Sequence, residues 1–440
     1  MRRIAVGSIV VLMACLAAGA LTSCSEPLPD DQGASATSDP ERVASTEACA
    51  DDLFACAANT VLADLLPDEP TEATGEPIVL GMVNQENTAA GSYPELSQGA
   101  QAAIDFINEQ LGGVDGRPLE LDVCNTEFSA EGSTSCAQRF VEEEVPAVLG
   151  GIDVFGNAID TLGENGIPYV GGIPVSTQSV TAPNSFQWSG GTWGATVAFA
   201  EHAATVAKAK RVSIVYGEFG SITHSAEVGA KVLEDHGVEA QLVPYPILAT
   251  DISSALNAAA ASDPDAIMVL AADAGCKAGF DGLDALDLDA VRYFVGACAS
   301  PAIIEEVGAA EADGAIFNVE GPIGVEEQPN DDFALYAAVV EQYGDGLDPV
   351  GAATVTFRAT MNLYLVLRQL EGDITPESIT AALQAQVDAP SFAGHPYTCD
   401  GEQFDGLPAM CSPQQILGEM TDGNLAQIGD WIDVGSIYQA

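Results

Sequence analysis

The stretch from residue 78 to residue 151 decides the fold: IVLGMVNQENTAAGSYPELSQGAQAAIDFINEQLGGVDGRPLELDVCNTEFSAEGSTSCAQRFVEEEVPAVLGG. Three short runs in it, 78–83, 119–124 and 146–151, have the composition of strands. The two segments between them, 96–110 and 130–144, carry apolar residues at helical spacing. Short strands that alternate with helices of this length predict a parallel sheet covered by helices on both faces.

The same alternation continues to about residue 297, with further strands such as RVSIVYG at 211–217 and DAIMVLAA at 265–272. The strands are too many for one doubly wound sheet, and 440 residues are too many for one core. We therefore expect an α/β protein with at least two domains.

The N-terminus predicts export and a lipid anchor. Arg2 and Arg3 precede the uncharged run 4–21, which is typical of a secretory signal. Leu-Thr-Ser-Cys at 21–24 then matches the bacterial lipobox, in which small residues admit the signal peptidase and the cysteine thiol receives the lipid. Residues 1–23 are expected to be removed, and Cys24 is the predicted lipid attachment site. The alternative is a plain signal peptide or a retained membrane helix.

Eight cysteines remain after the signal cysteine and Cys24 are set aside. An even number in an exported chain predicts disulfides, and these eight fall into four neighbouring pairs. The predicted bonds are Cys49–Cys56, Cys124–Cys136, Cys276–Cys298 and Cys399–Cys411. The alternative is metal ligation, but the sequence has no CxxC and no HxxxH or HExxH arrangement. We expect no metal and no cofactor.

Charge limits the partners. The chain has 65 acidic and 13 basic residues, which gives a formal net charge of −52. A field of this sign repels nucleic acid, so no nucleic-acid partner is expected. Hydrophobic residues make up 47% of the chain, which excludes global disorder. We interpret the excess of acidic residues as a solvated acidic surface, and adaptation to salt is an open alternative.

Between the lipobox and the first strand, residues 24–76 are interpreted as an acidic tether that contains a short helical segment at 48–66. The stretch 25–47 is rich in Pro, Asp, Ser, Ala and Thr, as flexible linkers are.

The series that starts at 78–151 and continues through IPYVGGIPVST, RVSIVYGEFGS and SDPDAIMVLAA resembles the type I solute-binding proteins, the Leu/Ile/Val-binding branch of ABC importers. The resemblance implies two Rossmann-like lobes that are joined by three crossings and close on a ligand. It places the first lobe at 77–190 plus 321–393 and the second at 191–320 plus 394–440. It also implies an ABC permease as partner, a small-molecule solute, and contact with the membrane through the N-terminal lipid.

In open α/β sheets, ligands bind beyond the carboxyl ends of the strands, and this rule selects the candidate ligand residues. They are Tyr93, Asp153, Val154, Phe155, Ser176, Thr177, Trp193, Phe219 and Asp273. Each has an alternative role. The aromatic residues could pack in the core, Ser176 or Thr177 could cap a helix, and Asp273 could be a solvated turn residue.

Two features argue against a branched-chain amino acid as the ligand. Relatives use an aromatic residue and an acid in the second lobe to hold the ammonium group, where this chain has Ala272 and Cys298. Asp153 stands where a ligand carboxylate would dock, and two like charges about 4 Å apart cost roughly 4 kcal/mol at an effective dielectric near 20. We expect a neutral or cationic solute with an apolar or aromatic body.

The sequence therefore predicts an extracytoplasmic receptor for import, with a ligand-sensing lipoprotein as the alternative. An enzyme is not expected. The sequence has no GxSxG and no phosphate-binding GxxxxGK[ST], and no cysteine is left for catalysis if all eight are paired.

Overall fold

The computed structural model describes residues 46–88, 91–319, 321 and 330–439, with only the backbone of Asp273. The signal segment, the lipobox and Cys24 lie outside these residues. Among the helices that are described, none is both long enough and apolar enough to cross a membrane.

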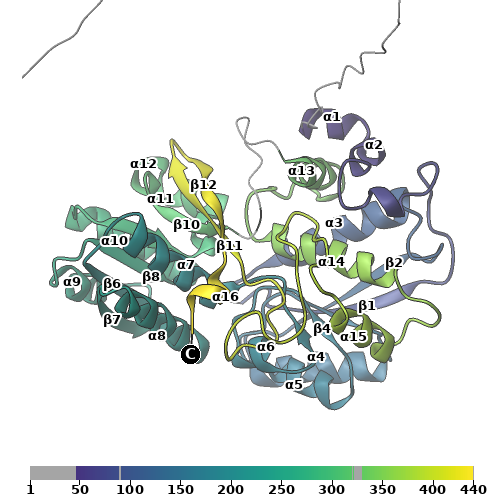
Figure 1. The fold of residues 1–440 in the computed structure, drawn as a ribbon, viewed down its shortest axis with the longest axis horizontal. Helices are drawn as coiled ribbons and strands as arrows, with labels where there is room; N and C mark the ends of the chain where they lie inside the picture. The colour runs from purple at the N-terminus through teal and green to yellow at the C-terminus, as the bar shows by residue number, and fades with distance from the viewer. Residues whose placement is uncertain (1–45, 89–90, 320, 322–329, 440) are drawn as a thin grey trace, which may run out of the picture. The chain divides into compact units, whose positions relative to one another are not determined.

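Two sheets, the first parallel and the second mostly parallel, organise the chain (Figure 1). The first sheet has five strands in the order β2-β1-β3-β4-β5, all parallel. Its strands are β1 (Ile78–Asn84), β2 (Leu119–Asn125), β3 (Val148–Gly150), β4 (Tyr169–Val170) and β5 (Ser185–Phe186). The predicted strands at 78–83, 119–124 and 146–151 are all present in it.

The second sheet has seven strands in the order β12-β11-β10-β9-β8-β6-β7. Its strands are β6 (Arg211–Glu218), β7 (Glu239–Pro246), β8 (Ala266–Leu270), β9 (Val291–Phe294), β10 (Ile316–Val319), β11 (Gln415–Thr421) and β12 (Asn424–Ile432). Strands β6 to β10 are parallel, whereas β11 and β12 form an antiparallel hairpin at the edge.

Helices cover both faces of each sheet, as the alternation predicts. The first sheet is covered by α3 (Pro94–Gln110), α4 (Ala130–Glu142), α5 (Asn157–Glu164), α6 (Thr177–Thr181), α13 (Asp331–Tyr343), α14 (Ala353–Leu367) and α15 (Pro376–Gln384). Around the second sheet lie α7 (Gly191–Thr205), α8 (Gly220–Asp235), α9 (Ser253–Ala260), α10 (Asp273–Leu286), η2 (Gly296–Ala299), α11 (Pro301–Val307), α12 (Ala309–Ala312) and α16 (Val434–Ile437). The result is two α/β lobes, in agreement with the predicted fold class.

The packing of α3 on α14 shows how small residues allow this covering. Gly99 lies where the two helices meet, and a Cβ atom there would be 2.6 Å from the carbonyl oxygen of Ala353. No real Cβ approaches an oxygen so closely, so only glycine permits this contact.

The chain crosses between the sheets three times: after β5, after β10 and before β11. The first and third crossings are bonded to each other. The backbone N–H of Gln187 donates to the backbone carbonyl of Ala409 at 2.8 Å, and the backbone N–H of Cys411 donates to the backbone carbonyl of Gln187 at 2.8 Å. The three-crossing hinge is therefore present. The predicted lobe boundaries stay a prediction. After the last of them, at 393/394, Tyr397 packs in the core of the first lobe and Phe404 in that of the second.

All four predicted disulfides are present, joining Cys49–Cys56, Cys124–Cys136, Cys276–Cys298 and Cys399–Cys411. The first lies in an N-terminal extension that consists of α1 (Thr46–Asp51), α2 (Leu53–Ala57) and η1 (Ala63–Leu65). Cys49, Leu53 and Leu62 of this extension are buried in the core of the first lobe. The segment interpreted as tether thus ends in a packed, disulfide-linked unit.

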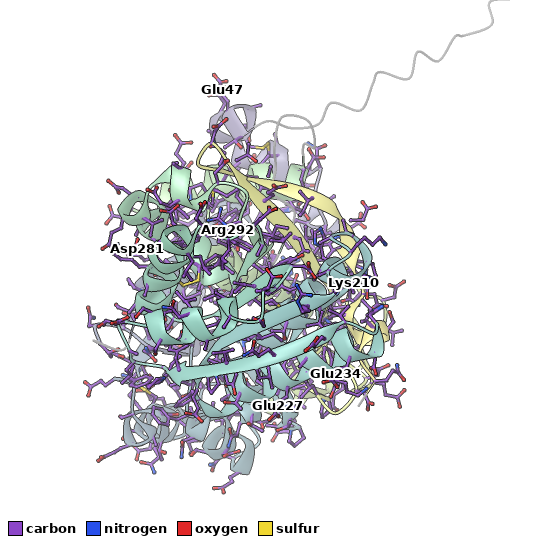
Figure 2. All side chains as sticks on the ribbon, turned by 90° about the vertical axis from the view of Figure 1, so that its left-hand side faces the viewer. Glu47, Lys210, Glu227, Glu234, Asp281 and Arg292 are labelled. Atoms are coloured by element: carbon purple, nitrogen blue, oxygen red, sulfur yellow. A yellow bond between two sulfur atoms is a disulfide. The ribbon has the colours of Figure 1, made fainter. Side chains whose placement is uncertain are left out.

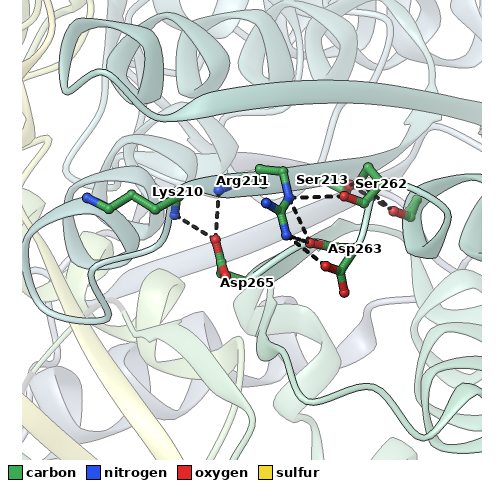
Figure 3. Close-up of polar contacts among 7 residues, drawn as sticks. Lys210, Arg211, Ser213, Ser262, Asp263 and Asp265 are labelled. Atoms are coloured by element: carbon green, nitrogen blue, oxygen red, sulfur yellow. Dashed lines mark hydrogen bonds and ion pairs between the residues drawn. The ribbon is translucent and has the colours of Figure 1, made fainter.

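At the amino ends of the second sheet, a polar cluster joins β6 to the loop before β8 (Figure 3). Asp265 accepts the backbone N–H groups of Lys210 and Arg211 at 2.7 and 2.9 Å, and these bonds lower its pKa. Arg211 in turn forms an ion pair with Asp263 at 2.9 Å. This cluster is at the end of the strands opposite to the predicted ligand loops, so we assign it a structural role.

Candidate functional site

The loops at the carboxyl end of the first sheet are held together by Asn84, the last residue of β1. Its side chain is fully buried. The amide donates to the Tyr93 carbonyl at 2.8 Å and to Glu86 Oε1 at 3.0 Å, and Asn84 Oδ1 accepts the N–H of Ile152 at 3.2 Å. One side chain thereby fixes the loops that follow β1 and β3. Sequence reasoning missed Asn84, although a polar residue that ends an apolar strand is a usable signal.

Asp153 lies in the loop after β3, as predicted, but its carboxylate is engaged inside the first lobe. The residue is 2% exposed. The Ser133 hydroxyl donates to Asp153 Oδ2 at 2.7 Å, and the N–H of Phe155 donates to Oδ1 at 3.3 Å. Burial raises the pKa of this carboxyl, and these hydrogen bonds oppose the rise. The predicted repulsion of a ligand carboxylate therefore lacks direct support in the geometry, because the bonds of Asp153 hold its own loop.

Ser176 caps a helix, which is the alternative role predicted for it. Its Oγ accepts the N–H of Ser179 at 3.2 Å, and it forms a capping box at the start of α6. Thr177, the first residue of α6, is exposed beside it. A ligand contact by either residue stays a prediction.

Three other candidates pack against hydrophobic cores. Trp193 is 1% exposed in the core of the second lobe, and its Nε1–H donates to Nδ1 of His224 at 3.1 Å. Tyr93 and Val154 are partly buried against the core of the first lobe. Trp193 thus packs in a core, and a ligand contact by any of the three stays a prediction. Asp273 begins α10, but its side chain lies outside the described residues, so its predicted role stays a prediction.

Phe155 and Phe219 are brought together from different lobes. Phe155 follows β3 and Phe219 follows β6, and their ring centroids are 6.1 Å apart with the planes at 88°. A second contact lies nearby in the sequence, since the Ser221 hydroxyl donates to the Val175 carbonyl. The loops selected by the strand-end rule therefore touch across the two lobes.

Phe128 is a third aromatic residue at this place, and sequence reasoning missed it. It follows β2, and its ring centroid is 5.5 Å from that of Phe155. In the second lobe, Cys298 is fully buried in its bond to Cys276, as expected. It therefore offers no charge to a ligand.

Two surface hollows lie elsewhere and contain none of the predicted ligand residues. One is beside β5 and the Cys399–Cys411 bond, and the other lies at the amino ends of β6 and β7. The ligand-side loops of the two lobes contact each other in this structure.

Two α/β lobes with parallel sheets, three crossings and facing strand-end loops define a hinged binding protein. The family model described as periplasmic binding protein matches residues 77–411. The chain therefore belongs to the periplasmic binding protein family, and its lobes are those of type I. Membership of this family implies an extracytoplasmic location.

Solved structures agree on the fold. A leucine-binding protein from Thermotoga maritima is 17% identical, with a TM-score of 0.66, and the match covers 81% of this chain and 98% of that one. A branched-chain amino acid transporter substrate-binding protein from Streptococcus pneumoniae, in complex with isoleucine, is 16% identical, with a TM-score of 0.65 over 80% and 99% of the chains. A possible leucine/isoleucine/valine-binding protein from Rhodopirellula baltica is 14% identical, with a TM-score of 0.69 over 82% and 98%. A comparison with curated proteins finds no match.

Proposed function

We propose that this chain is a lipid-anchored solute-binding receptor, which captures a small polar or amphipathic solute between its lobes and delivers it to an ABC importer. The observation that carries the proposal is the meeting of strand-end loops from both sheets, through Phe155 and Phe219 and through Ser221 and Val175. Loops at this position are where open α/β sheets bind ligands.

The hydrogen bond and the aromatic contact between the loops are each weak, as a reversible trap requires. A single hydrogen bond contributes about 0.5–1.5 kcal/mol, and one aromatic contact adds a similar amount. A ligand that touches both lobes shifts the equilibrium by its differential affinity for the closed state.

The ligand is proposed to be neutral, with an apolar or aromatic body. The named relatives include proteins for leucine and for isoleucine, but this chain has Ala272 and a disulfide-bonded Cys298 where an ammonium partner would be needed. An unpaired ammonium loses hydration on closure without compensation.

A soluble chain that starts at residue 46 tests the proposal directly. We expect at least one solute among amino acids, amides, amines, sugars and aromatic acids to raise the melting temperature. Calorimetry should give one site per chain, and small-angle X-ray scattering should show a smaller radius of gyration with the bound solute. Phe219→Ala should weaken binding, whereas Phe54→Ala, a change in the N-terminal extension, should not. Binding that is equally strong in both variants would contradict this position for the site.

The lipid anchor has its own test at Cys24. Cys24→Ser removes the thiol that would be lipidated, so we expect released protein or an unprocessed precursor in place of a membrane-bound form. Detergent-phase partitioning and the intact mass report the outcome. A variant that still enters the detergent phase after maturation to the wild-type mass would show that the anchor lies elsewhere.

A further inference from the structure

The phenylalanines of this chain fall into two groups. Of the 15 in the sequence, 12 belong to the hydrophobic cores or pack against them. The other three are Phe128, Phe155 and Phe219, and in the part of the chain that the structure describes they join no core. They contact each other in turn, at 5.5 and 6.1 Å between ring centroids. We call these three residues the aromatic row.

The aromatic row stands at the ligand side of both lobes. Its members follow β2, β3 and β6, and each ring remains partly exposed in spite of its contacts. An apolar ring that stays partly exposed to water contributes little to folding stability. A ligand that covers these rings gains binding free energy from the apolar area that it buries.

The loop that carries Phe128 has an uncommon backbone. Glu127 and Phe128 both have φ of 51°, which places two consecutive residues that are not glycine in the left-handed region. Such conformations are costly and persist where the surroundings impose them, often at ligand sites.

The surroundings impose this one from both ends. Asn125 Oδ1 accepts the N–H groups of Glu86 and Glu127 at 3.0 and 2.9 Å. Ser129 caps α4 by accepting the N–H of Gly132 at 2.9 Å. The Cys124–Cys136 bond closes the loop covalently. These hydrogen bonds and the disulfide hold the loop in the conformation that places Phe128 against Phe155.

We propose that the aromatic row is the recognition surface of the ligand site, that Phe128 is a specificity-determining residue in it, and that the solute carries a planar aromatic ring. This inference rests on the proposed function. The rings of the row meet edge to face, at 62° and 88°. When the lobes part, a planar ring can enter between Phe155 and Phe219 and repeat this geometry, which the quadrupole of an aromatic ring favours.

Matched pairs of probes separate aromatic recognition from simple apolar burial. The pairs are benzamide and cyclohexanecarboxamide, benzylamine and cyclohexylmethylamine, and benzoate and cyclohexanecarboxylate. A saturated ring has at least as much apolar area as the aromatic one, so burial alone does not favour the aromatic member. We expect calorimetry to show tighter binding of the aromatic member by about two- to tenfold, the range that aromatic contacts supply.

Phe128→Leu tests the third member of the row. It should lower the affinity ratio within a pair, because the ring of Phe128 packs on that of Phe155, while Phe54→Leu, a change at a partly buried phenylalanine packed on the first core, should leave the ratio unchanged. Melting curves establish that both variants fold.

The possible results separate this inference from the proposed function. If the chain binds only solutes without an aromatic ring, such as leucine, or binds both members of each pair equally, the aromatic assignment is overturned and the receptor function stands. If Phe128→Leu weakens both members by the same factor, Phe128 is not a determinant of specificity. If no solute of either panel binds, both proposals fail.

Discussion

Asp332 shows how one partly buried carboxylate can join segments that are distant in the sequence. It lies in the first turn of α13 and accepts the N–H of Ala393 at 2.8 Å and the N–H of Val61 from the N-terminal extension. Burial is the main reason that its pKa is raised from 3.8 to about 6. The position matters for stability because a group whose pKa changes on folding makes the free energy of unfolding depend on pH.

The sign follows from the raised pKa. The folded chain holds this proton more tightly than the unfolded chain, so the stabilising contribution is present below pH 3.8 and is lost as the pH rises through about 6. We expect Asp332 to lower the free energy of unfolding by about 2 kcal/mol between pH 4 and pH 7.5, and Asp332→Asn to remove this loss.

Urea unfolding of wild type and variant at both pH values measures the difference. Asp331→Asn is the comparison: the Asp331 charge raises the pKa of Asp332 less than burial does, so most of the pH-dependent loss should remain in this variant. A wild-type chain and an Asp332→Asn variant that lose equal stability over this pH interval would contradict the assignment.

At the scale of elements, the connection from β2 to α4 depends on the Cys124–Cys136 bond. This bond spans 12 residues and encloses the left-handed pair Glu127 and Phe128. A disulfide around a loop of this length contributes about 3 kcal/mol, mainly by restricting the unfolded chain.

We expect the double variant Cys124→Ser, Cys136→Ser to lose about 3 kcal/mol of stability. Hydrogen exchange at residues 125–129 should also become faster in the folded state. The double variant Cys49→Ser, Cys56→Ser is the control, since its loop lies in the N-terminal extension and should leave exchange at 125–129 unchanged. Equal exchange at 125–129 in the two variants would show that the disulfide does not hold this loop.

The elements that sequence reasoning located are those with strong periodicity. The strand predicted at 119–124 is β2 at Leu119–Asn125, and the helix predicted at 130–144 is α4 at Ala130–Glu142. The hairpin of β11 and β12 was missed, although Asp422 and Gly423, with φ of 50° and 81°, form the Asp-Gly turn that signals one.

The candidate site was less predictable than the fold, for a physical reason. The strand-end rule finds loops, and it found Phe155 and Phe219, but it does not tell which side chains turn inward. Asp153 turns to Ser133 and Trp193 to His224, and neither orientation can be inferred from spacing. Phe128 depends on two left-handed residues that no local composition announces.

At the scale of the whole molecule, charge is the dominant feature. The net charge is −52, and carboxylates such as Glu227, Glu234 and Asp281 project from the second lobe (Figure 2). Some of the basic side chains in this lobe already form ion pairs, for example Lys231 with Asp235 at 2.8 Å. Self-repulsion of this kind destabilises a compact state and is screened by salt.

We expect the melting temperature to rise between 0.1 and 1 M NaCl, where the Debye length falls from about 10 to 3 Å. Each kcal/mol of relieved repulsion corresponds to about 2–4 °C in a domain of 150–250 residues, and to less in a longer chain. Differential scanning calorimetry measures the shift, and sucrose of matched osmolality is the control for excluded solutes. A constant or falling melting temperature would show that the charges are spaced widely enough not to interact.

The placement of the N-terminal extension has a mechanical consequence. Because Cys49, Leu53 and Leu62 are buried in the core of the first lobe, the extension belongs to that half of the hinge. A force applied at residue 46 therefore acts on the first lobe, and the second lobe can rotate about the hinge without carrying the extension with it.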